Sequence, residues 1–382
     1  MGEAGRMLDR AARLALRGAG LVEPNPMVGA VIVRGGEVIG AGHHRFFGGP
    51  HAEAEALDDC RRRGHDPAGA TMYVTLEPCD HHGKQPPCTG SIIASGISRV
   101  VFARRDPNPA ASGGAARLFN AGLAVELCGE SPLARGVGAP FTRRITAGLP
   151  WVIAKWAQTI DGRVATRTGE SKWVSGERSR ARVHRLRARV DAVITGIGTV
   201  LADDPMLTAR GVRRVRRPAA RVICDSDLDL PLDAAVVRTA REVPTIVACV
   251  RELASADLTA SKRRALSAAG VEVIGVPEAG RGVDLRAVLG ALAGRGASVV
   301  MVEAGPGLVG SFLDSDLIDE AVVYLAPLML GDEMARSVAA GRVAPTLASA
   351  RAMSLWRVKP LGGDVELTYR RPDPPDVPLG LV

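Results

Sequence analysis

The stretch TLEPCDHHGKQPPC, residues 75–88, joins the end of an apolar run to two cysteines that each follow a proline. A second stretch, PHAE at 50–53, adds an imidazole and a carboxylate. One histidine and two cysteines are a typical ligand set for a catalytic zinc, because three protein ligands leave the fourth tetrahedral position open for water. The two stretches therefore predict a zinc site with the ligands His51, Cys79 and Cys88. Glu53 remains as a carboxylate that binds no metal and can move a proton.

Both stretches place their ligands where helices are expected to begin. Residues two apart in mid-helix point to nearly opposite sides, so His51 and Glu53 can share a site only at a helix start. Glycines and a proline precede them, and helix formers follow to Arg63. Two prolines likewise precede Cys88, at a position where a helix N-terminus would favour a thiolate. Zinc deaminases of nucleobases use this chemistry, although their general signature, Pro-Cys-x-x-Cys, has a shorter loop. The alternative is a set of scattered cysteines and histidines without a metal.

Length and composition narrow the class of protein. The 382 residues suggest two or more domains, and the net charge of +8 suits phosphate-bearing ligands or nucleic acid without choosing between them. Six cysteines are too few and too irregular for a secreted disulfide scaffold. The other four are expected to be plain buried residues: Cys60, Cys128, Cys224 and Cys249. Without a long apolar run or a signal peptide, the sequence predicts a soluble cytoplasmic protein.

Hydrophobic periodicity predicts two α/β domains. Helices are expected at 3–17, 51–63, 114–121 and 132–145, and strands at 27–33, 38–42, 71–76, 99–103 and 123–127. This order is typical of an α/β/α sandwich. A boundary is expected at Leu149-Pro-Trp151, where a new strand and helix alternation begins that ends in an antiparallel edge strand at 365–369. The predicted domains are residues 1–147 and 148–372, followed by a disordered proline-rich tail at 373–382.

The second domain contains its own candidate ligand loop. Residues 298–311 combine a strand, a G-x-G-x-x-G run beginning at Gly305, and a helix, which would let phosphate approach backbone amides. The run lies too late in the domain for a Rossmann unit, so we expect a nucleotide-phosphate loop on another kind of sheet. The alternative is a glycine turn for close packing. Thr199, Asp203 and Arg210 could orient a sugar and a phosphate nearby, although Asp-Asp-Pro alone could equally be a helix stop.

Several motifs together resemble the bifunctional deaminase/reductase family of riboflavin biosynthesis. In the first half they are PNPMVG at 24–29, GAGHH at 40–44, PHAE at 50–53 and the long loop between Cys79 and Cys88. In the second half they are KWAQTIDG at 155–162, SKW at 171–173, DDP at 203–205, LTAR at 207–210 and EAGP at 303–306. The resemblance covers roughly residues 5–370. It implies a cytidine-deaminase-like α/β/α sandwich followed by a dihydrofolate-reductase-like α/β domain.

The resemblance also implies an activity and its cofactors. A zinc hydroxide would remove the 2-amino group of 2,5-diamino-6-ribosylamino-4(3H)-pyrimidinone 5′-phosphate, with Glu53 passing a proton to the departing ammonia. NADPH would then reduce the ribosyl group to ribityl, giving 5-amino-6-ribitylamino-uracil 5′-phosphate. One zinc per chain and NADPH are the expected cofactors. The expected partners are the phosphorylated pyrimidine and further copies of the chain in a homo-oligomer, without nucleic acid or membrane.

Motif position assigns further contacts. The deaminase substrate contacts implied by the resemblance are Asn25, His44, His81, Lys84, Asp106 and Asn108. The implied NADPH contacts are Ala157, Trp173, Thr199, Asp203, Ser226, Gly305, Pro306, Gly307, Leu308, Val309, Gly310 and Ser311. The implied contacts to the reductase substrate are Ser171, Arg187, Leu207, Arg210 and Glu303.

Two alternatives to a bifunctional enzyme remain at this point. One is a deaminase of nucleic-acid bases with a basic C-terminal binding module, which the arginine clusters would serve but which the scarcity of aromatic residues disfavours. The second alternative is a protein in which only one half is an active enzyme and the remaining half is a structural or oligomerising module. The complete motifs in both halves argue against it.

Overall fold

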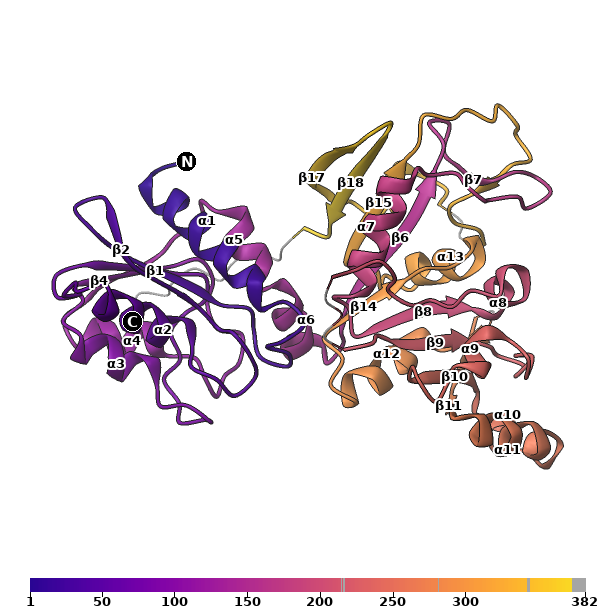
Figure 1. Ribbon diagram of the computed structural model, residues 1–382, viewed down its shortest axis with the longest axis horizontal. Helices are drawn as coiled ribbons and strands as arrows, with labels where there is room; N and C mark the ends of the chain where they lie inside the picture. The colour runs from indigo at the N-terminus through magenta and orange to yellow at the C-terminus, as the bar shows by residue number, and fades with distance from the viewer. Residues whose placement is uncertain (214, 216, 281, 342–343, 373–382) are drawn as a thin grey trace. The chain divides into compact units, whose positions relative to one another are not determined.

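The computed structural model describes residues 1–213, 215, 217–280, 282–341 and 344–372. The described chain forms two compact units, Met1–Gly148 and a second that begins at Leu149 (Figure 1). The predicted tail at 373–382 lies outside the described residues. Each unit has its own sheet and its own core, so each is considered by itself.

The first unit is built on a mixed sheet in the order β2-β1-β3-β4-β5. Strands β1 and β2 form an antiparallel hairpin, β1 pairs antiparallel with β3, and β3, β4 and β5 run parallel. The strands are β1 (Gly29–Arg34), β2 (Glu37–His43), β3 (Thr71–Val74), β4 (Arg99–Phe102) and β5 (Ala124–Leu127). The helices are α1 (Glu3–Ala15), the short η1 (Leu16–Gly18), α2 (Ala52–Arg62), α3 (Cys88–Ala94), α4 (Gly114–Asn120), α5 (Pro132–Val137) and α6 (Ala139–Ala147).

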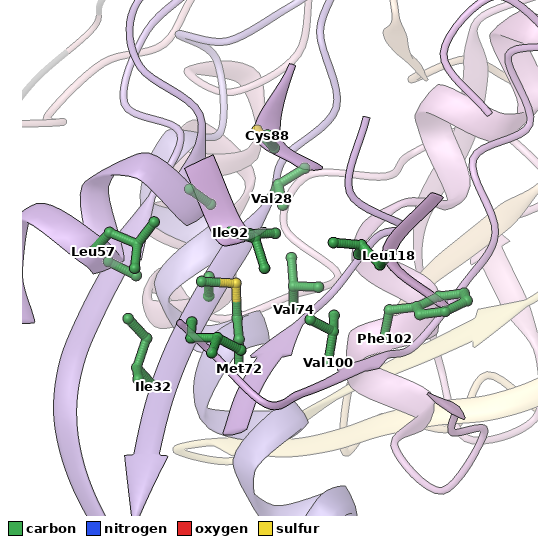
Figure 2. Close-up of a cluster of buried hydrophobic side chains, with 14 of the residues drawn as sticks. Val28, Ile32, Leu57, Met72, Val74, Cys88, Ile92, Val100, Phe102 and Leu118 are labelled. Atoms are coloured by element: carbon green, nitrogen blue, oxygen red, sulfur yellow. The ribbon is translucent and has the colours of Figure 1, made fainter. Parts of the chain in front are cut away.

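Alternation along the strands gives this sheet an apolar layer on each face. On one face, Ile32, Met72 and Val74 pack with α2, α3 and α4. Figure 2 shows Ile92 of α3 beside Val74 and Met72, with Cys88 at the edge of the same cluster. On the other face, the neighbouring strand residues pack against α1 and α5. The unit is therefore an α/β/α sandwich, and its core fixes the start of α3.

The second unit has a larger sheet in the order β11-β10-β9-β8-β14-β6-β15-β18-β17. Its strands run parallel from β11 to β15, whereas β18 is antiparallel to both β15 and β17. These strands are β6 (Trp151–Gln158), β8 (Ala192–Gly196), β9 (Ala220–Cys224), β10 (Thr245–Val250), β11 (Val271–Val276), β14 (Val299–Val302), β15 (Glu320–Leu325), β17 (Ser354–Leu361) and β18 (Asp364–Arg370). Two short ladders join β7 (Arg163–Ala165) to β16 (Arg336–Ser337) and β12 (Glu278–Ala279) to β13 (Gly282–Val283).

Helices pack on the second sheet, and two of them begin at its carboxyl edge. The helices are α7 (Glu177–Arg187), α8 (Ile197–Asp203), α9 (Ala235–Arg238), α10 (Arg251–Ser255), η2 (Asp257–Thr259), α11 (Ala260–Ala269), α12 (Leu285–Gly294), α13 (Pro306–Asp314) and η3 (Leu347–Ser349). Parallel β8 and β14 are neighbours, so α8 and α13 both begin at the carboxyl edge of the sheet. A Cβ on Gly196 would lie 3.6 Å from Leu308, which shows how closely the two helix starts approach. Helix N-termini favour anions.

Two elements differ from the sequence prediction. The single helix expected at 132–145 is two helices, because Pro140 at the start of α6 has no amide hydrogen with which to continue α5. The strand expected at 365–369 is not an edge, since β18 pairs on both sides and β17 takes the outer position. Strand β17 is mostly exposed, so it lacks the apolar alternation that would have indicated a strand.

Candidate active sites

The three predicted zinc ligands meet in the first unit. His51 is the residue before α2, Cys88 begins α3, and Cys79 follows β3. His51 Nδ1 lies 3.3 Å from Cys88 Sγ and 3.4 Å from Cys79 Sγ, and the three ligand atoms lie within 4.8 Å of one another. This is the chemistry and spacing of a three-ligand zinc site. The residues present therefore fit a zinc ion with an open coordination position.

The electrostatics of the ligands also suit a metal. A hydrogen bond from the Cys88 thiol, helped by the His51 ring, lowers the pKa of Cys79 to about 4. The thiolate is the form of cysteine that binds metals. Cys79 and Cys88 are both buried, so water competes little for their sulfur atoms.

Glu53 lies in the first turn of α2 and is only 4 % exposed. Burial, together with the negative charge of Cys79, raises the pKa of Glu53 to about 7. A carboxyl group with a pKa near neutrality can both accept and return a proton, as general acid-base catalysis requires. The start of α2 thus places the imidazole of His51 and the buried carboxyl group of Glu53 two residues apart, and the role of Glu53 as a proton carrier stays a prediction.

Asn25 and His44 lie on one side of the zinc ligands. Asn25 Nδ2 is 3.2 Å from His44 Nε2, and His44 Nδ1 is 2.8 Å from the carbonyl oxygen of Pro50. The His44 and His51 rings meet edge to face with centroids 5.5 Å apart. Burial lowers the pKa of His44, which favours its neutral form. The structure therefore brings Asn25 and His44 to the metal site.

Asp106 and Asn108 lie in the loop after β4, near the thiol of Cys79. Asp106 Oδ1 accepts a hydrogen bond from the Asn108 amide at 2.9 Å, and burial raises the pKa of Asp106 to about 6. Buried Glu77 fixes this loop, because its carboxylate accepts the amides of Asp106 at 3.2 Å and Ala115 at 2.9 Å. Sequence reasoning did not select Glu77, although it directly precedes Pro78 and Cys79.

His81 and Lys84 lie in the loop that joins the two thiol ligands. The loop is fixed at its base, where Thr89 donates to Asp80 at 2.6 Å. In the part of the chain that the structure describes, the buried Nδ1 of His81 has no hydrogen-bond partner. Such a nitrogen is available to a ligand, which is consistent with the predicted substrate contact.

In the second unit, partly buried ion pairs converge on Glu303 at the end of β14. Lys155 Nζ lies 3.1 Å from Glu303 Oε1, and Arg187 donates to both carboxylate oxygens at 2.8 and 2.9 Å. Burial alone would raise the pKa of Glu303, but Lys155 and Arg187 hold it at about 2. Arg187 also donates to the carbonyl oxygen of Thr208 at 3.0 Å. The group as a whole carries one net positive charge, which suits an anionic substrate.

The loop after α8 brings Leu207 and Arg210 to the same cluster. Leu207 is buried with a φ of 53°, and the Arg210 amide donates to His184 Nδ1 at 3.2 Å. Helix α8 ends at Asp203 and Asp204 has a φ of 40°, so the Asp-Asp-Pro sequence is a helix stop. Thr208 was quoted in the sequence motif but not selected as a site residue, although its carbonyl joins the loop to Arg187.

Of the predicted cofactor residues, Thr199 and the run 305–311 lie at the starts of α8 and α13. The Gly305 amide donates to Thr199 Oγ1 at 3.3 Å, and a Cβ at Gly307 would meet no heavy atom within 4 Å. Gly305 and Gly307 therefore leave the open approach that a phosphate needs. Gly310 is different: a Cβ there would lie 2.0 Å from the Ala340 carbonyl oxygen, so this glycine serves close packing. The remaining residues of this run, Pro306, Leu308, Val309 and Ser311, form the first turns of α13.

The loop that contains Ser171 and Trp173 is tied to both neighbouring helices. Lys172 pairs with Asp203 at 3.0 Å, and the Arg180 guanidinium lies 4.6 Å from the centre of the Trp173 ring. Trp173 is 69 % exposed, so its ring is open to a ligand. Ser171 accepts the amide of Val174 through its carbonyl oxygen at 3.2 Å, which closes the turn.

Ala157 and Ser226 complete the predicted cofactor set. Ala157 lies near the carboxyl end of β6, beside Tyr324 of β15. Ser226 follows β9, and its hydroxyl accepts the Val283 amide at 3.1 Å. Ser226 therefore contacts the β12–β13 hairpin, and it follows β9, the strand next to β8 from which the chain leads to Thr199.

Comparison with known proteins agrees with this pair of sites. The model of the cytidine and deoxycytidylate deaminase zinc-binding region matches residues 2–104, and the model of the RibD C-terminal domain matches residues 150–365. The Aquifex aeolicus riboflavin biosynthesis protein RibD is 43 % identical, over 84 % of this chain and 85 % of its own length. The Actinobacillus pleuropneumoniae RibD is 38 % identical, over 95 % of this chain and 94 % of its own.

This chain belongs to the RibD family. Among solved structures, the Thermotoga maritima diaminohydroxyphosphoribosylaminopyrimidine deaminase/5-amino-6-(5-phosphoribosylamino)uracil reductase is 33 % identical, with a TM-score of 0.78 over 97 % of this chain and 99 % of that chain. An Acinetobacter baumannii RibD is 34 % identical, with a TM-score of 0.77 over the same shares.

RibD membership makes the chain a bifunctional enzyme of riboflavin biosynthesis that first deaminates and then reduces. The deaminase is of the zinc-binding class, and the reductase implies a nicotinamide cofactor. Family membership decides against a nucleic-acid deaminase with a basic binding module. Across the described residues, no helix is long and apolar enough to cross a membrane.

The structure adds Lys155 to the Glu303 cluster of this RibD protein, a residue that the sequence motifs did not single out. Lys155 was quoted as part of a motif, but only the structure shows that it shares Glu303 with Arg187. These three residues come from β6, α7 and the end of β14, so their sequence positions give no sign of contact. The signal that could have found Lys155 is a lysine in an otherwise apolar strand, since buried lysines are usually paired.

Proposed function

We propose that the deaminase acts on 2,5-diamino-6-ribosylamino-4(3H)-pyrimidinone 5′-phosphate. The observation that carries this proposal is the pairing of a His51, Cys79 and Cys88 site with a buried Glu53 whose pKa is about 7. The Thermotoga maritima relative is named as a diaminohydroxyphosphoribosylaminopyrimidine deaminase and 5-amino-6-(5-phosphoribosylamino)uracil reductase, which supports this substrate. We also propose one zinc per chain.

Deamination would use residues from several segments around the metal. When bound, the zinc supplies a water molecule of lowered pKa. Glu53 takes a proton from the attacking oxygen and gives it to the departing ammonia. Asn25, His44 and Asp106 hold the pyrimidine ring in place, while His81, Lys84 and Asn108 hold the ribosyl phosphate. Lys84 is exposed on the loop and suits a phosphate, because its ammonium is a compact charge with three donors.

Reduction would take place at the carboxyl edge of the second sheet. We propose NADPH as the cofactor, which the open Gly305–Gly307 turn, Ala157 and the exposed Trp173 would hold. Thr199, Asp203, Ser226 and the start of α13 are the further contacts. Arg187, Arg210 and Glu303 would orient the ribosyl phosphate together with Ser171 and Leu207, and bound NADPH would supply the hydride for C1′. Lys155 keeps Glu303 ionised and in place.

This assigns the deaminase to residues 1–147 and the reductase to residues 148–372. A homo-oligomeric state and a cytoplasmic location stay predictions from the sequence.

A coupled assay tests the proposal. Zinc-replete protein, the diaminopyrimidine ribosyl phosphate and NADPH should give equal amounts of ammonia and oxidised cofactor. NADH in place of NADPH tests the cofactor assignment. Ammonia without oxidation of either cofactor would contradict the assignment of the second site. No ammonia from zinc-replete protein would contradict the substrate assignment.

A further inference from the structure

The loop between the two thiol ligands, residues 80–87, is fastened near its tip to the segment 46–49. The ammonium of Lys84 lies 4.0 Å from the centre of the Phe47 ring, and Gln85 donates through Nε2 to the Gly48 carbonyl at 2.9 Å. The Lys84 side chain also runs past Gly48, where a Cβ would lie 3.5 Å from Lys84 Cδ. We call these contacts the loop clip.

The clip lies beside the metal site because of how the chain runs. Both ends of the 80–87 loop are zinc ligands, and the segment 46–49 leads through Pro50 to His51, the third ligand. The Phe47 amide donates to the Leu21 carbonyl at 3.0 Å, so the segment under the ring is itself held in place. A fixed ring at this point determines where the Lys84 ammonium rests.

We propose that Phe47 is a positioning residue that holds Lys84 for the phosphate group of the deaminase substrate. This inference rests on the proposed function, in which Lys84 contacts that phosphate. The negative face of an aromatic ring attracts an ammonium group. An exposed lysine otherwise samples many rotamers, and ordering it on binding has an entropic cost. With its ammonium on the Phe47 ring, Lys84 is ordered in advance and still has N–H donors free for phosphate oxygens.

The neighbouring phenylalanine provides a matched control. Phe46 is 53 % exposed and Phe47 is 42 % exposed, so neither ring belongs to the buried core of the unit. The Phe46 ring instead packs over Gly49, where a Cβ would lie 2.8 Å from the ring. Replacing Phe46 removes an aromatic side chain from the same segment without touching Lys84.

The test is a double-mutant cycle with two substrates. Ammonia release is measured for wild type, Phe47→Leu, Phe46→Leu, Lys84→Met and Phe47→Leu/Lys84→Met, each with its zinc content. The substrates are the ribosyl 5′-phosphate and the same compound without the phosphate. Phe47→Leu should raise KM for the phosphorylated substrate by roughly two- to fivefold, the range of an exposed cation–π contact, with kcat unchanged. KM for the dephosphorylated compound should not change. Phe47→Tyr keeps the ring and should behave as wild type.

The outcomes separate this inference from the proposed function. The double variant should be no worse than Lys84→Met, because Phe47 acts through Lys84. Two results would overturn the role of Phe47 and leave the proposed function intact. One is an equal increase in KM for both substrates in Phe47→Leu. The other is wild-type kinetics in Phe47→Leu while Lys84→Met is impaired. Wild-type kinetics in Lys84→Met would overturn both the inference and the phosphate contact assigned to Lys84. A wild type that releases no ammonia at all would contradict the proposed function itself.

Discussion

The two sites are held together in different ways. The deaminase site is local: His51 and Glu53 are two residues apart, and Cys79 and Cys88 are the two ends of one loop. The Glu303 cluster joins β6, α7 and β14 through partly buried ion pairs. The first arrangement depends on helix starts and a metal, and the second depends on charges that only the folded sheet brings together. A substitution in the first should therefore affect chemistry more than folding, and one in the second should affect both.

The largest effect is expected from Glu53→Gln, which removes the proton carrier and keeps the shape of the side chain. Ammonia release should fall by about 10²- to 10⁴-fold, the usual contribution of general acid-base catalysis. Reduction of the deaminated intermediate should be unchanged, and zinc content by elemental analysis should match wild type. Loss of both activities in a folded protein would show that the two sites are not independent.

Glu303→Gln tests the other kind of site. It leaves the charges of Lys155 and Arg187 without their partly buried anion, which should lower the free energy of unfolding of the second unit by about 3 kcal/mol and abolish reduction. All four tryptophans, Trp151, Trp156, Trp173 and Trp356, lie in this unit, so tryptophan fluorescence during urea unfolding reports on it alone. Ammonia release serves as the control and should persist. An unchanged unfolding midpoint would contradict the role given to the ion pairs.

Acid should weaken the second unit through the same carboxylate. The pKa of Glu303 is about 2 in the folded chain, below its ordinary value of 4.5, so its stabilising contribution is present above pH 4.5 and is lost as pH falls toward 2. The amount is on the order of 3 kcal/mol. The free energy of unfolding, measured by urea titration with tryptophan fluorescence as the signal, should fall for the wild type over this pH range. In Glu303→Gln the fall should be smaller by this amount. Parallel curves for the two proteins would disprove the linkage.

The smallest expected effect is a difference in stability between alanine variants of two glycines in the same G-x-G-x-x-G run. Gly310→Ala places a methyl group against the Ala340 carbonyl and should destabilise the second unit by about 2 kcal/mol. Gly307→Ala meets open space in the same helix and should be neutral or slightly stabilising. Thermal unfolding by tryptophan fluorescence measures both. Equal destabilisation by Gly310→Ala and Gly307→Ala would contradict this explanation, because it would show that the contact with Ala340 is not the cause.

The same contrast explains how far the sequence could be interpreted without a structure. The prolines before His51 and Cys88 have a local meaning, so the two helix starts and the meeting of His51, Cys79 and Cys88 could be predicted from the sequence. The contact between Lys155 and Glu303 depends on β6 and β14 being neighbours, which no local pattern contains. The G-x-G-x-x-G run shows both limits: Gly305 and Gly307 are open as a phosphate loop requires, whereas Gly310 follows the packing alternative.

The position of β6 in the second sheet has a consequence for how the chain is made. Strand β6 is the first strand of its unit to leave the ribosome, yet its neighbours β14 and β15 are synthesised late. The first unit has its whole sheet by Leu127 and can fold during translation, while β6 must wait unpaired. Nascent chains that stall before Val299 should therefore carry a folded deaminase and an unfinished, chaperone-dependent reductase.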